Sequence, residues 1–280
     1  HVSSRRQRQM CIRDRITLLA IFCLIMVAIA FSPLGLGGGI LYVPIMHYML
    51  NWEMRESLVA SLTLVLMVSI GSSLAHSKSG FADKDAAKLG RVSAAPSAVI
   101  GVLLSGLLLS LVGDIGIKII AAIIVSFVIE RTVRKWLSGE HEYQDVKLTD
   151  NRNRYIFGSS FAGLSSGILG IGGGAILVTV NRSIMKMDSK KAAGTSYMVV
   201  SVIVPIALAS HLIMSKNLDT IIGQAGLIPV LTIPILVLLS AYYGAKYAIK
   251  FLPKQAVTVV FLLVISIGLI RYLVDFYSLL

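Results

Sequence analysis

A glycine-rich stretch occurs twice in this chain, at the same place in two related halves. LGLGGGILYVP covers residues 34–44, and LGIGGGAILVT covers residues 169–179. An ungapped offset of 135 residues superimposes six identical residues of the two stretches. The same offset aligns two further pairs, Ser61 with Ser196 and His76 with His211. The sequence therefore predicts a duplicated unit.

The rest of the chain is strongly apolar. Its residues are 56% hydrophobic and 14% charged, and its mean hydropathy is +0.81. Charge-free apolar runs cover residues 16–50, 57–77, 92–113, 119–129, 155–181, 192–215, 220–245 and 255–270. Several of these runs have the length of a membrane-spanning helix. We therefore expect an all-α polytopic membrane protein.

The net charge of +12 does not indicate a nucleic-acid-binding protein. The basic residues lie in short segments beside the apolar runs, where they contact lipid headgroups and set the topology. Residues 170–175, GIGGGA, satisfy the loose dinucleotide-binding pattern G-x-G-x-x-A. That pattern requires a preceding strand in a βαβ unit, whereas long helical runs flank it here. We expect no enzyme, and no catalytic residue, metal or cofactor.

The domain boundaries follow from two polar segments. Residues 1–15 carry five arginines and resemble translated sequencing-adapter tails, so we expect this tail to be non-native. The segment 138–153 is the only sizeable polar connection between apolar runs. We therefore expect a first transmembrane repeat over residues 16–137 and a second over residues 154–280.

Each half begins with an apolar run that is too long for one membrane span. A continuous helix over residues 16–50 would be about 52 Å long at 1.5 Å per residue, against a hydrocarbon core of about 30 Å. Residues 154–187 pose the same problem, and in both cases the glycine cluster lies near the middle. Glycine is disfavoured inside a helix by about 1 kcal/mol relative to alanine. We therefore predict a helix, a glycine break and a second short helix in each half.

The basic residues indicate whether each broken pair doubles back or runs straight through the membrane. Without the tail, doubling back places 17 lysines and arginines on one side and four on the other. The straight path splits them 12 against nine, and with the tail both paths give 17 against nine. The preference for doubling back therefore depends on the tail being foreign.

Doubling back gives each half five membrane elements. Because five is odd, the second half would be inverted relative to the first, as in many secondary transporters. Both termini would then lie outside, and the connection 138–153 would be cytoplasmic.

The glycine clusters suit an anion-binding site. A helix that begins after either cluster has unpaired N–H groups and a positive dipole end at its first turn. Glycine also lets a ligand approach the backbone, and irregular backbone inside a membrane is tolerated where it lines a cavity or is buried in protein. The alternative is that small residues merely allow helices to pack closely. Because the cluster is repeated, we predict substrate binding by Gly37, Gly38, Gly39, Gly172, Gly173 and Gly174.

Hydroxyl groups in the next helix of each half are further candidates for substrate contact. Serines inside spans often bond to backbone carbonyls, so the repeat-matched pair Ser61 and Ser196 is the better choice. Thr195 directly precedes Ser196. The hydroxyl groups of three further residues are weaker candidates: Ser32, Tyr42 and Tyr197.

Two histidines, His76 and His211, stand near the ends of the same helices. Histidine titrates near neutrality, so either could couple proton movement to transport. An interfacial histidine that caps a helix explains each one equally well.

None of the apolar runs contains Asp, Glu, Lys or Arg. This argues against a carboxylate proton relay, a buried sodium-binding carboxylate and a cationic substrate. Backbone dipoles and hydroxyl groups suit an oxyanion instead. The charged residues Glu53, Arg55 and Glu56 are expected in a solvated loop.

The glycine stretches, together with AAGTS at residues 192–196 and the histidine fifteen residues later, resemble the sulfite exporter TauE/SafE family, also called the toluenesulfonate uptake permeases. The resemblance runs from about Ile16 over nearly the whole chain. It implies transport of sulfite, sulfoacetate or another organosulfur anion across the bacterial cytoplasmic (inner) membrane, and places the family's glycine motifs at Gly35–Gly39 and Gly170–Gly174. The first half departs from the family pattern, because Ala60 in VASL replaces a hydroxyl residue.

These observations predict a multi-pass secondary transporter that moves a small anion, sulfite or an organosulfonate, by alternating access. Its partners would be the anionic substrate, membrane lipid and a coupling proton or sodium ion, with no nucleic acid. A passive anion channel and a non-transporting membrane scaffold remain as alternatives. The sequence does not indicate the oligomeric state.

Overall fold

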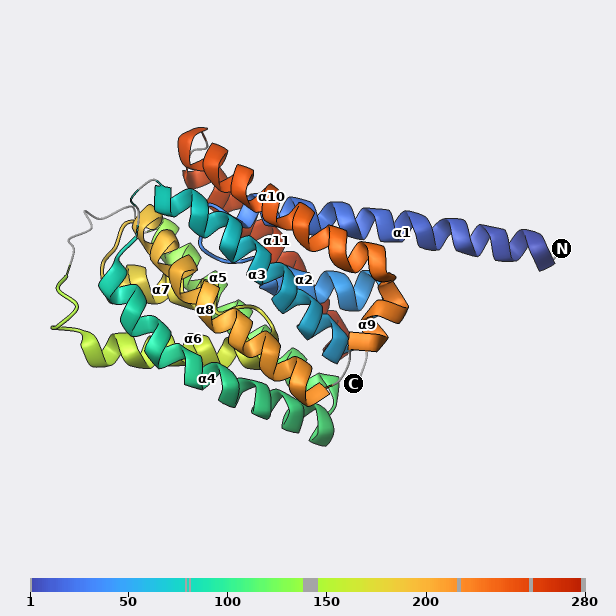
Figure 1. The fold of residues 1–280 in the computed structure, drawn as a ribbon, viewed down its shortest axis with the longest axis horizontal. Helices are drawn as coiled ribbons and strands as arrows, with labels where there is room; N and C mark the ends of the chain where they lie inside the picture. The colour runs from blue at the N-terminus through green and yellow to red at the C-terminus, as the bar shows by residue number, and fades with distance from the viewer. Residues whose placement is uncertain are drawn as a thin grey trace.

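The computed structural model describes residues 2–78, 80, 82–137, 146–215, 218–251 and 254–277. Within these ranges every regular element is a helix (Figure 1). Residue 1 of the predicted tail and residues 138–145 of the predicted connection lie outside the described residues. The expected all-α fold is confirmed.

The first half contains a broken helix pair followed by three long helices. Its elements are α1 (Val2–Phe31), α2 (Gly39–Pro44), the π-helix η1 (Ile45–Met49), α3 (Met54–Lys78), α4 (Lys84–Leu111) and α5 (Asp114–Leu137). Helix α1 ends before the first glycine cluster and α2 begins at its last glycine. The predicted glycine break is therefore present.

The second half repeats this order. Its elements are α6 (Arg152–Leu169), α7 (Gly174–Ser183), α8 (Ser189–Ser215), α9 (Leu218–Ala225), α10 (Leu227–Phe251) and α11 (Lys254–Tyr277). The starts of α2 and α7, and those of α3 and α8, differ by the 135-residue offset of the sequence repeat. The short helix α9 is an addition, because no separate helix precedes α4 in the first half.

Both broken pairs double back. At the far end of the second pair, the Tyr155 hydroxyl of α6 donates to the Asn181 side-chain oxygen of α7 over 3.0 Å. In the first pair, Ile16 and Thr17 of α1 line the same cavity as Met49 at the end of η1. Each pair is therefore a helical hairpin with its glycine cluster at the tip, as Figure 1 shows.

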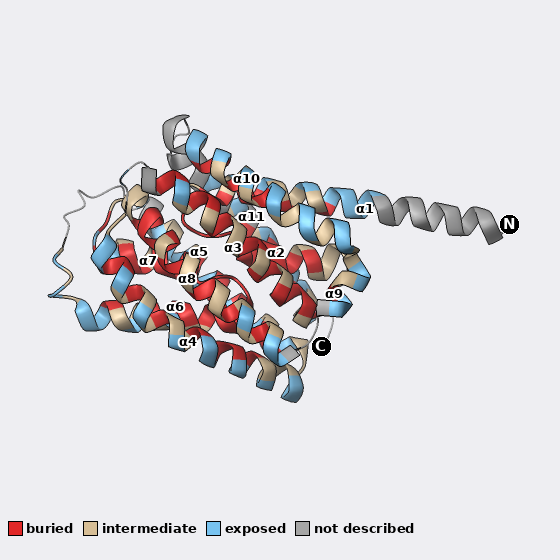
Figure 2. Cartoon of the chain, viewed as in Figure 1, coloured by how far each residue is buried: buried red, intermediate tan, exposed pale blue. Residues whose placement is uncertain are grey.

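Four helical segments among the described residues are long and apolar enough to span a membrane: Met54–His76, Lys84–Leu111, Ser189–Met214 and Leu227–Tyr247. Only 11% of the most apolar window of Leu227–Tyr247 is buried inside the protein. Large apolar side chains of this segment, such as those of Ile228 and Leu231, are exposed. Figure 2 accordingly colours much of α10 as exposed or intermediate. An apolar surface of this extent requires lipid as its solvent, so the chain is a multi-pass membrane protein.

The central helices α3 and α8 run in opposite directions, as Figure 1 shows. His76, near the end of α3, lies against Tyr197, near the beginning of α8, with ring centroids 5.8 Å apart. Both helices pack against the two hairpin tips, as the hydrogen bonds described below show. They therefore hold the glycine clusters in the middle of the molecule.

Candidate functional site

The glycine clusters adopt a backbone conformation that only glycine takes without strain. Gly38 has a φ of 79° and Gly173, its repeat mate, a φ of 67°. The positive φ recurs at two other matched pairs, Gly35 with Gly170 and Gly37 with Gly172. Because side chains with a Cβ rarely occupy this region, the conformation explains these six glycines by itself.

The third glycine of each cluster is helical and is required for close approach. A Cβ atom placed on Gly39 would lie 2.5 Å from the Ile171 Cα. A Cβ atom placed on Gly174 would lie 2.7 Å from the Gly35 carbonyl oxygen and 2.9 Å from the Leu36 carbonyl carbon. The two hairpin tips are therefore in backbone contact, so close packing also explains the clusters.

The hydroxyl groups of Ser61 and Ser196 join the two tips. Ser61 Oγ on α3 donates to the Gly170 carbonyl oxygen over 2.8 Å, and Ser196 Oγ on α8 lies 3.0 Å from the Gly35 carbonyl oxygen. Ser196 Oγ also lies 3.2 Å from the carbonyl oxygen of Gly174. Each serine thus reaches the glycine motif of the other half.

These contacts are reciprocal under the repeat offset. Ser61 with Gly170 corresponds to Ser196 with Gly35, and the approach of Gly39 to Ile171 corresponds to that of Gly174 to Leu36. Pairing of residue i with j and of j with i is what a two-fold axis generates. The contacts between the two glycine motifs are therefore reciprocal between the halves.

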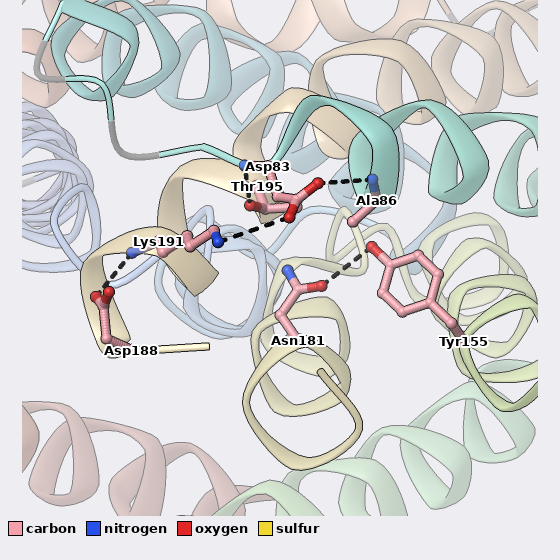
Figure 3. Close-up of polar contacts among 7 residues, drawn as sticks. All are labelled: Asp83, Ala86, Tyr155, Asn181, Asp188, Lys191 and Thr195. Atoms are coloured by element: carbon pink, nitrogen blue, oxygen red, sulfur yellow. Dashed lines mark hydrogen bonds and ion pairs between the residues drawn. The ribbon is translucent and has the colours of Figure 1, made fainter. Parts of the chain in front are cut away.

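The Thr195 hydroxyl is hydrogen-bonded outside the glycine motifs. Its hydroxyl oxygen accepts a hydrogen bond from the Asp83 backbone N–H over 2.9 Å (Figure 3). The Asp83 carboxylate caps α4 through the Ala86 N–H at 3.0 Å, and Lys191 Nζ lies 3.7 Å away from it. Thr195 therefore ties α8 to the start of α4 in this conformation.

A second polar network beside it holds the α6–α7 hairpin. The Asn181 side chain accepts from the Tyr155 hydroxyl, as Figure 3 shows, and donates to the Ala192 carbonyl oxygen over 3.0 Å. Neither Tyr155 nor Asn181 has an identical mate under the 135-residue offset, so the repeat gives no signal for them. Asn181 stands at the border of an apolar run, where a loop position is the simpler interpretation.

The two histidines differ although the repeat aligns them. A ring nitrogen of His211 lies 2.8 Å from the Gly167 carbonyl oxygen. Neither ring nitrogen of His76 makes a hydrogen bond of ordinary geometry, although only 1% of this residue is exposed and the Ser32 backbone lies nearby. His211 thus has a structural bond that His76 lacks.

A cavity of about 870 Å³ lies between α1, η1, α3, α9 and α10. Val59, Ala60 and Thr63, which flank Ser61 on α3, are among its lining residues. None of the motif glycines lines it. The cavity therefore leads to the level of Ser61 from one end of the molecule but does not include the glycine tips.

One loop prediction was wrong. Glu56, expected in a solvated loop, lies in the first turn of α3 with 4% of its surface exposed. Its Oε2 atom has no hydrogen-bond partner. Within the described residues, no group of three His, Cys, Asp or Glu side chains is placed to hold a metal ion.

A duplicated bundle of apolar helices, with two glycine-tipped hairpins meeting at its centre, defines a multi-pass helical membrane protein. Residues 19–272 match the family model described as sulfite exporter TauE/SafE. The chain therefore belongs to the TauE/SafE family, which is a family of membrane transporters for sulfite-related anions. Neither the curated proteins nor the solved structures gave a match.

Proposed function

We propose that this protein is a secondary transporter that moves sulfite or an organosulfonate across the bacterial cytoplasmic membrane by alternating access. The observation that carries the proposal is the reciprocal contact between the two glycine motifs at the centre of the helical bundle. Membership of the TauE/SafE family supports an anionic, sulfur-containing substrate.

The two halves would form inverted repeats. Two observations support this arrangement: α3 and α8 run in opposite directions, and the serine–glycine contacts are reciprocal between the halves. The pseudo-two-fold axis that relates the halves would lie in the membrane plane. Inverted repeats of this kind hold the substrate near the bilayer midplane, between broken helices. Rocking of one half against the other would then expose the glycine motifs to each side in turn.

The glycine motifs would bind the anion through backbone N–H groups at the starts of α2 and α7. Ser61 and Ser196 would support this site by fixing the motif carbonyls, in addition to any direct contact with the substrate. Thr195 would reach the substrate only after its hydrogen bond from Asp83 breaks.

The two ends of the molecule differ in a way that suits alternating access. The cavity beside Ala60 and Thr63 approaches the motifs from one end. At the other end, the Thr195–Asp83 bond and the Tyr155–Asn181 bond hold α4, α6, α7 and α8 together. We infer that the described conformation is closed at the second end and partly open at the first.

Proton coupling would use His76 rather than His211. The His211 ring is engaged with the Gly167 carbonyl, whereas both nitrogens of His76 are unpartnered. A histidine with a free nitrogen can gain or lose a proton without breaking an existing bond. Sodium coupling would leave transport unchanged by a proton gradient.

Flux measurements on purified protein in liposomes test the proposed function. The substrates are sulfite, thiosulfate, methanesulfonate and acetate, each offered under a proton gradient, a sodium gradient and no gradient. We expect uptake of a sulfur oxyanion that exceeds uptake by protein-free liposomes and accumulates against its own gradient. Anion currents without accumulation would indicate a channel, and no flux of any of these anions would contradict a transport role.

A further inference from the structure

Several buried polar atoms near the first glycine motif have no hydrogen-bond partner. They are the Tyr42 hydroxyl, the Ser72 hydroxyl and both ring nitrogens of His76. Tyr42 and Ser72 are fully buried, and His76 is 1% exposed. Unpaired polar groups in a membrane interior are costly, so their concentration at one place requires an explanation.

These atoms belong to one cluster around Tyr197. The Tyr197 hydroxyl donates to the Phe31 carbonyl oxygen over 2.8 Å, and the His76 ring lies 5.8 Å from the Tyr197 ring. The Ser72 hydroxyl neighbours the Tyr197 hydroxyl without a hydrogen bond of ordinary geometry. Tyr42 neighbours Tyr197 as well, and its ring packs beside Gly38. We call Tyr42, Ser72, His76 and Tyr197 the tyrosine cluster.

The backbone of the first glycine motif completes the tyrosine cluster. Residues 35–37 lie beside Tyr197, because the Tyr197 hydroxyl donates to the Phe31 carbonyl oxygen and the preceding Ser196 hydroxyl contacts the Gly35 carbonyl oxygen. Successive N–H groups of a loop with alternating backbone conformations form a concave anion-binding nest. Gly35 and Gly37 have the positive φ values of 80° and 74° that such a nest uses.

The chemistry of the tyrosine cluster suits an anion with several oxygen atoms. Hydroxyl and N–H groups can all donate to such an anion. The cationic Lys190 contributes to the electrostatic surroundings of His76. Removal of the oxyanion from water would be offset by several hydrogen bonds to a charged acceptor.

The repeat does not reproduce the tyrosine cluster in the second half. The 135-residue offset places Leu177 at the position of Tyr42, Ala207 at that of Ser72 and Leu62 at that of Tyr197. The histidine mate, His211, is already bonded to Gly167. The two glycine motifs are therefore alike in backbone and unlike in their side-chain surroundings.

We propose that the tyrosine cluster and the N–H groups of residues 35–37 bind the oxyanion group of the substrate, so that the binding site is asymmetric. The second glycine motif then contributes backbone N–H groups and packs against the first, without a tyrosine cluster of its own. This inference rests on the proposed anion transport, because it names the place where the transported anion is held. It goes beyond the proposed function by assigning side-chain recognition of the anion to the first half only.

Anion-dependent thermal stabilisation of the purified protein in detergent provides the test, with sulfite and methanesulfonate as probes. The cluster variants are Tyr42→Phe and Ser72→Ala. The matched controls are Tyr272→Phe, a tyrosine that is 4% exposed, and Ser159→Ala, a buried serine whose hydroxyl also lacks a partner. Neither control residue belongs to the tyrosine cluster or the glycine motifs.

We expect each cluster variant to weaken anion binding roughly tenfold or more, because a hydrogen bond to a charged group is lost. Without anion, the same variants should melt at the wild-type temperature or higher, because an unpaired buried hydroxyl is removed. A purely structural role would instead lower the melting temperature. The controls should bind the probe anion like the wild type.

Flux of the same variants separates this inference from the proposed function. If the wild-type protein transports sulfite and both cluster variants bind and transport it equally well, the tyrosine cluster is not the site, although the transport function stands. If the wild-type protein neither binds nor transports any probe anion, the proposed function fails, and the inference fails with it. Loss of binding in the control variants as well would also overturn the assignment.

Discussion

Ser61 Oγ on α3 donates a hydrogen bond of 2.8 Å to the carbonyl oxygen of Gly170, which is 109 residues away in the other half of the chain. Its repeat mate Ser196 makes the corresponding contact with Gly35 over 3.0 Å. A carbonyl at a helix break inside a membrane has no helical partner and no water. The two serines therefore satisfy the carbonyls that the glycine breaks leave free, and in doing so they lock the halves together.

Substitution of either serine should destabilise the protein measurably. We expect Ser61→Ala and Ser196→Ala each to lower the free energy of unfolding by about 1 kcal/mol or more, because a buried carbonyl loses its partner. Thr63→Ala is the matched control, since its hydroxyl donates to Val59 in its own helix over 3.1 Å and should matter less. Thermal unfolding in detergent provides the measurement. Equal effects in all three variants would contradict a special role for the serines.

The third glycine of each motif should be the least replaceable. Gly39→Ala would place a Cβ atom 2.5 Å from the Ile171 backbone, and Gly174→Ala would place one 2.7 Å from the Gly35 oxygen. Backbone atoms cannot move aside as a flexible side chain can. We therefore expect each variant to lower the free energy of unfolding by at least about 2 kcal/mol.

The control for these glycines is Gly223→Ala in α9, where an added Cβ would meet nothing within 4 Å. It should be neutral or slightly stabilising, because alanine is the better helix former. Yield and melting temperature of the monodisperse protein distinguish the variants. Wild-type behaviour of Gly39→Ala would show that the tips are not in backbone contact.

The helix breaks could be predicted from the sequence because their cause is local. An uncharged run over residues 16–50 exceeds the thickness of a bilayer, and the glycine cluster marks a place near its middle where the helix can break. The short helix α9 could not be predicted in the same way, since it has no repeat mate and lies within one apolar run, 220–245, together with α10.

The surroundings of the candidate site were harder to predict than its position. In the sequence, Ser61 and Thr195 are both hydroxyl residues in apolar helices. In the structure, Ser61 donates to the Gly170 carbonyl oxygen, whereas Thr195 accepts from the Asp83 N–H. These partners are more than a hundred residues distant, so no local pattern reveals them. Ser72 was missed because repeat matching selects symmetric pairs, and its mate is Ala207.

An ion pair outside the apolar runs predicts a pH-dependent stability. The Asp275 carboxylate, beyond the apolar run of α11, accepts from Lys118 Nζ over 2.7 Å and from the Tyr48 hydroxyl over 2.8 Å. Burial raises the pKa of Asp275, but these hydrogen bonds and the charges of Lys118 and Arg271 outweigh burial and hold the pKa below its ordinary value.

Because the folded-state pKa is depressed, the stabilisation is fully present above the unfolded pKa of about 3.9 and is lost as the pH falls through the folded value. We therefore expect Asp275→Asn to melt below the wild type at pH 7 and the difference to shrink below about pH 4. Glu130→Gln is the control, because the Glu130 and Arg134 side chains are 45% and 75% exposed and such a pair contributes little. A difference that stays constant from pH 7 to pH 3 would rule out this linkage.

Cysteine labelling should establish how α8 crosses the membrane. Ser183 at the end of α7 and Thr220 in α9 are both exposed and flank α8. The segments at the Ser183 end hold most of the lysines and arginines, and basic loops remain in the cytoplasm. In a background with Cys11 and Cys23 replaced by serine, we expect a membrane-impermeant maleimide to label Thr220→Cys in intact cells and Ser183→Cys only after lysis. The reverse pattern would invert the proposed orientation, and labelling of both in intact cells would mean that α8 does not cross the membrane.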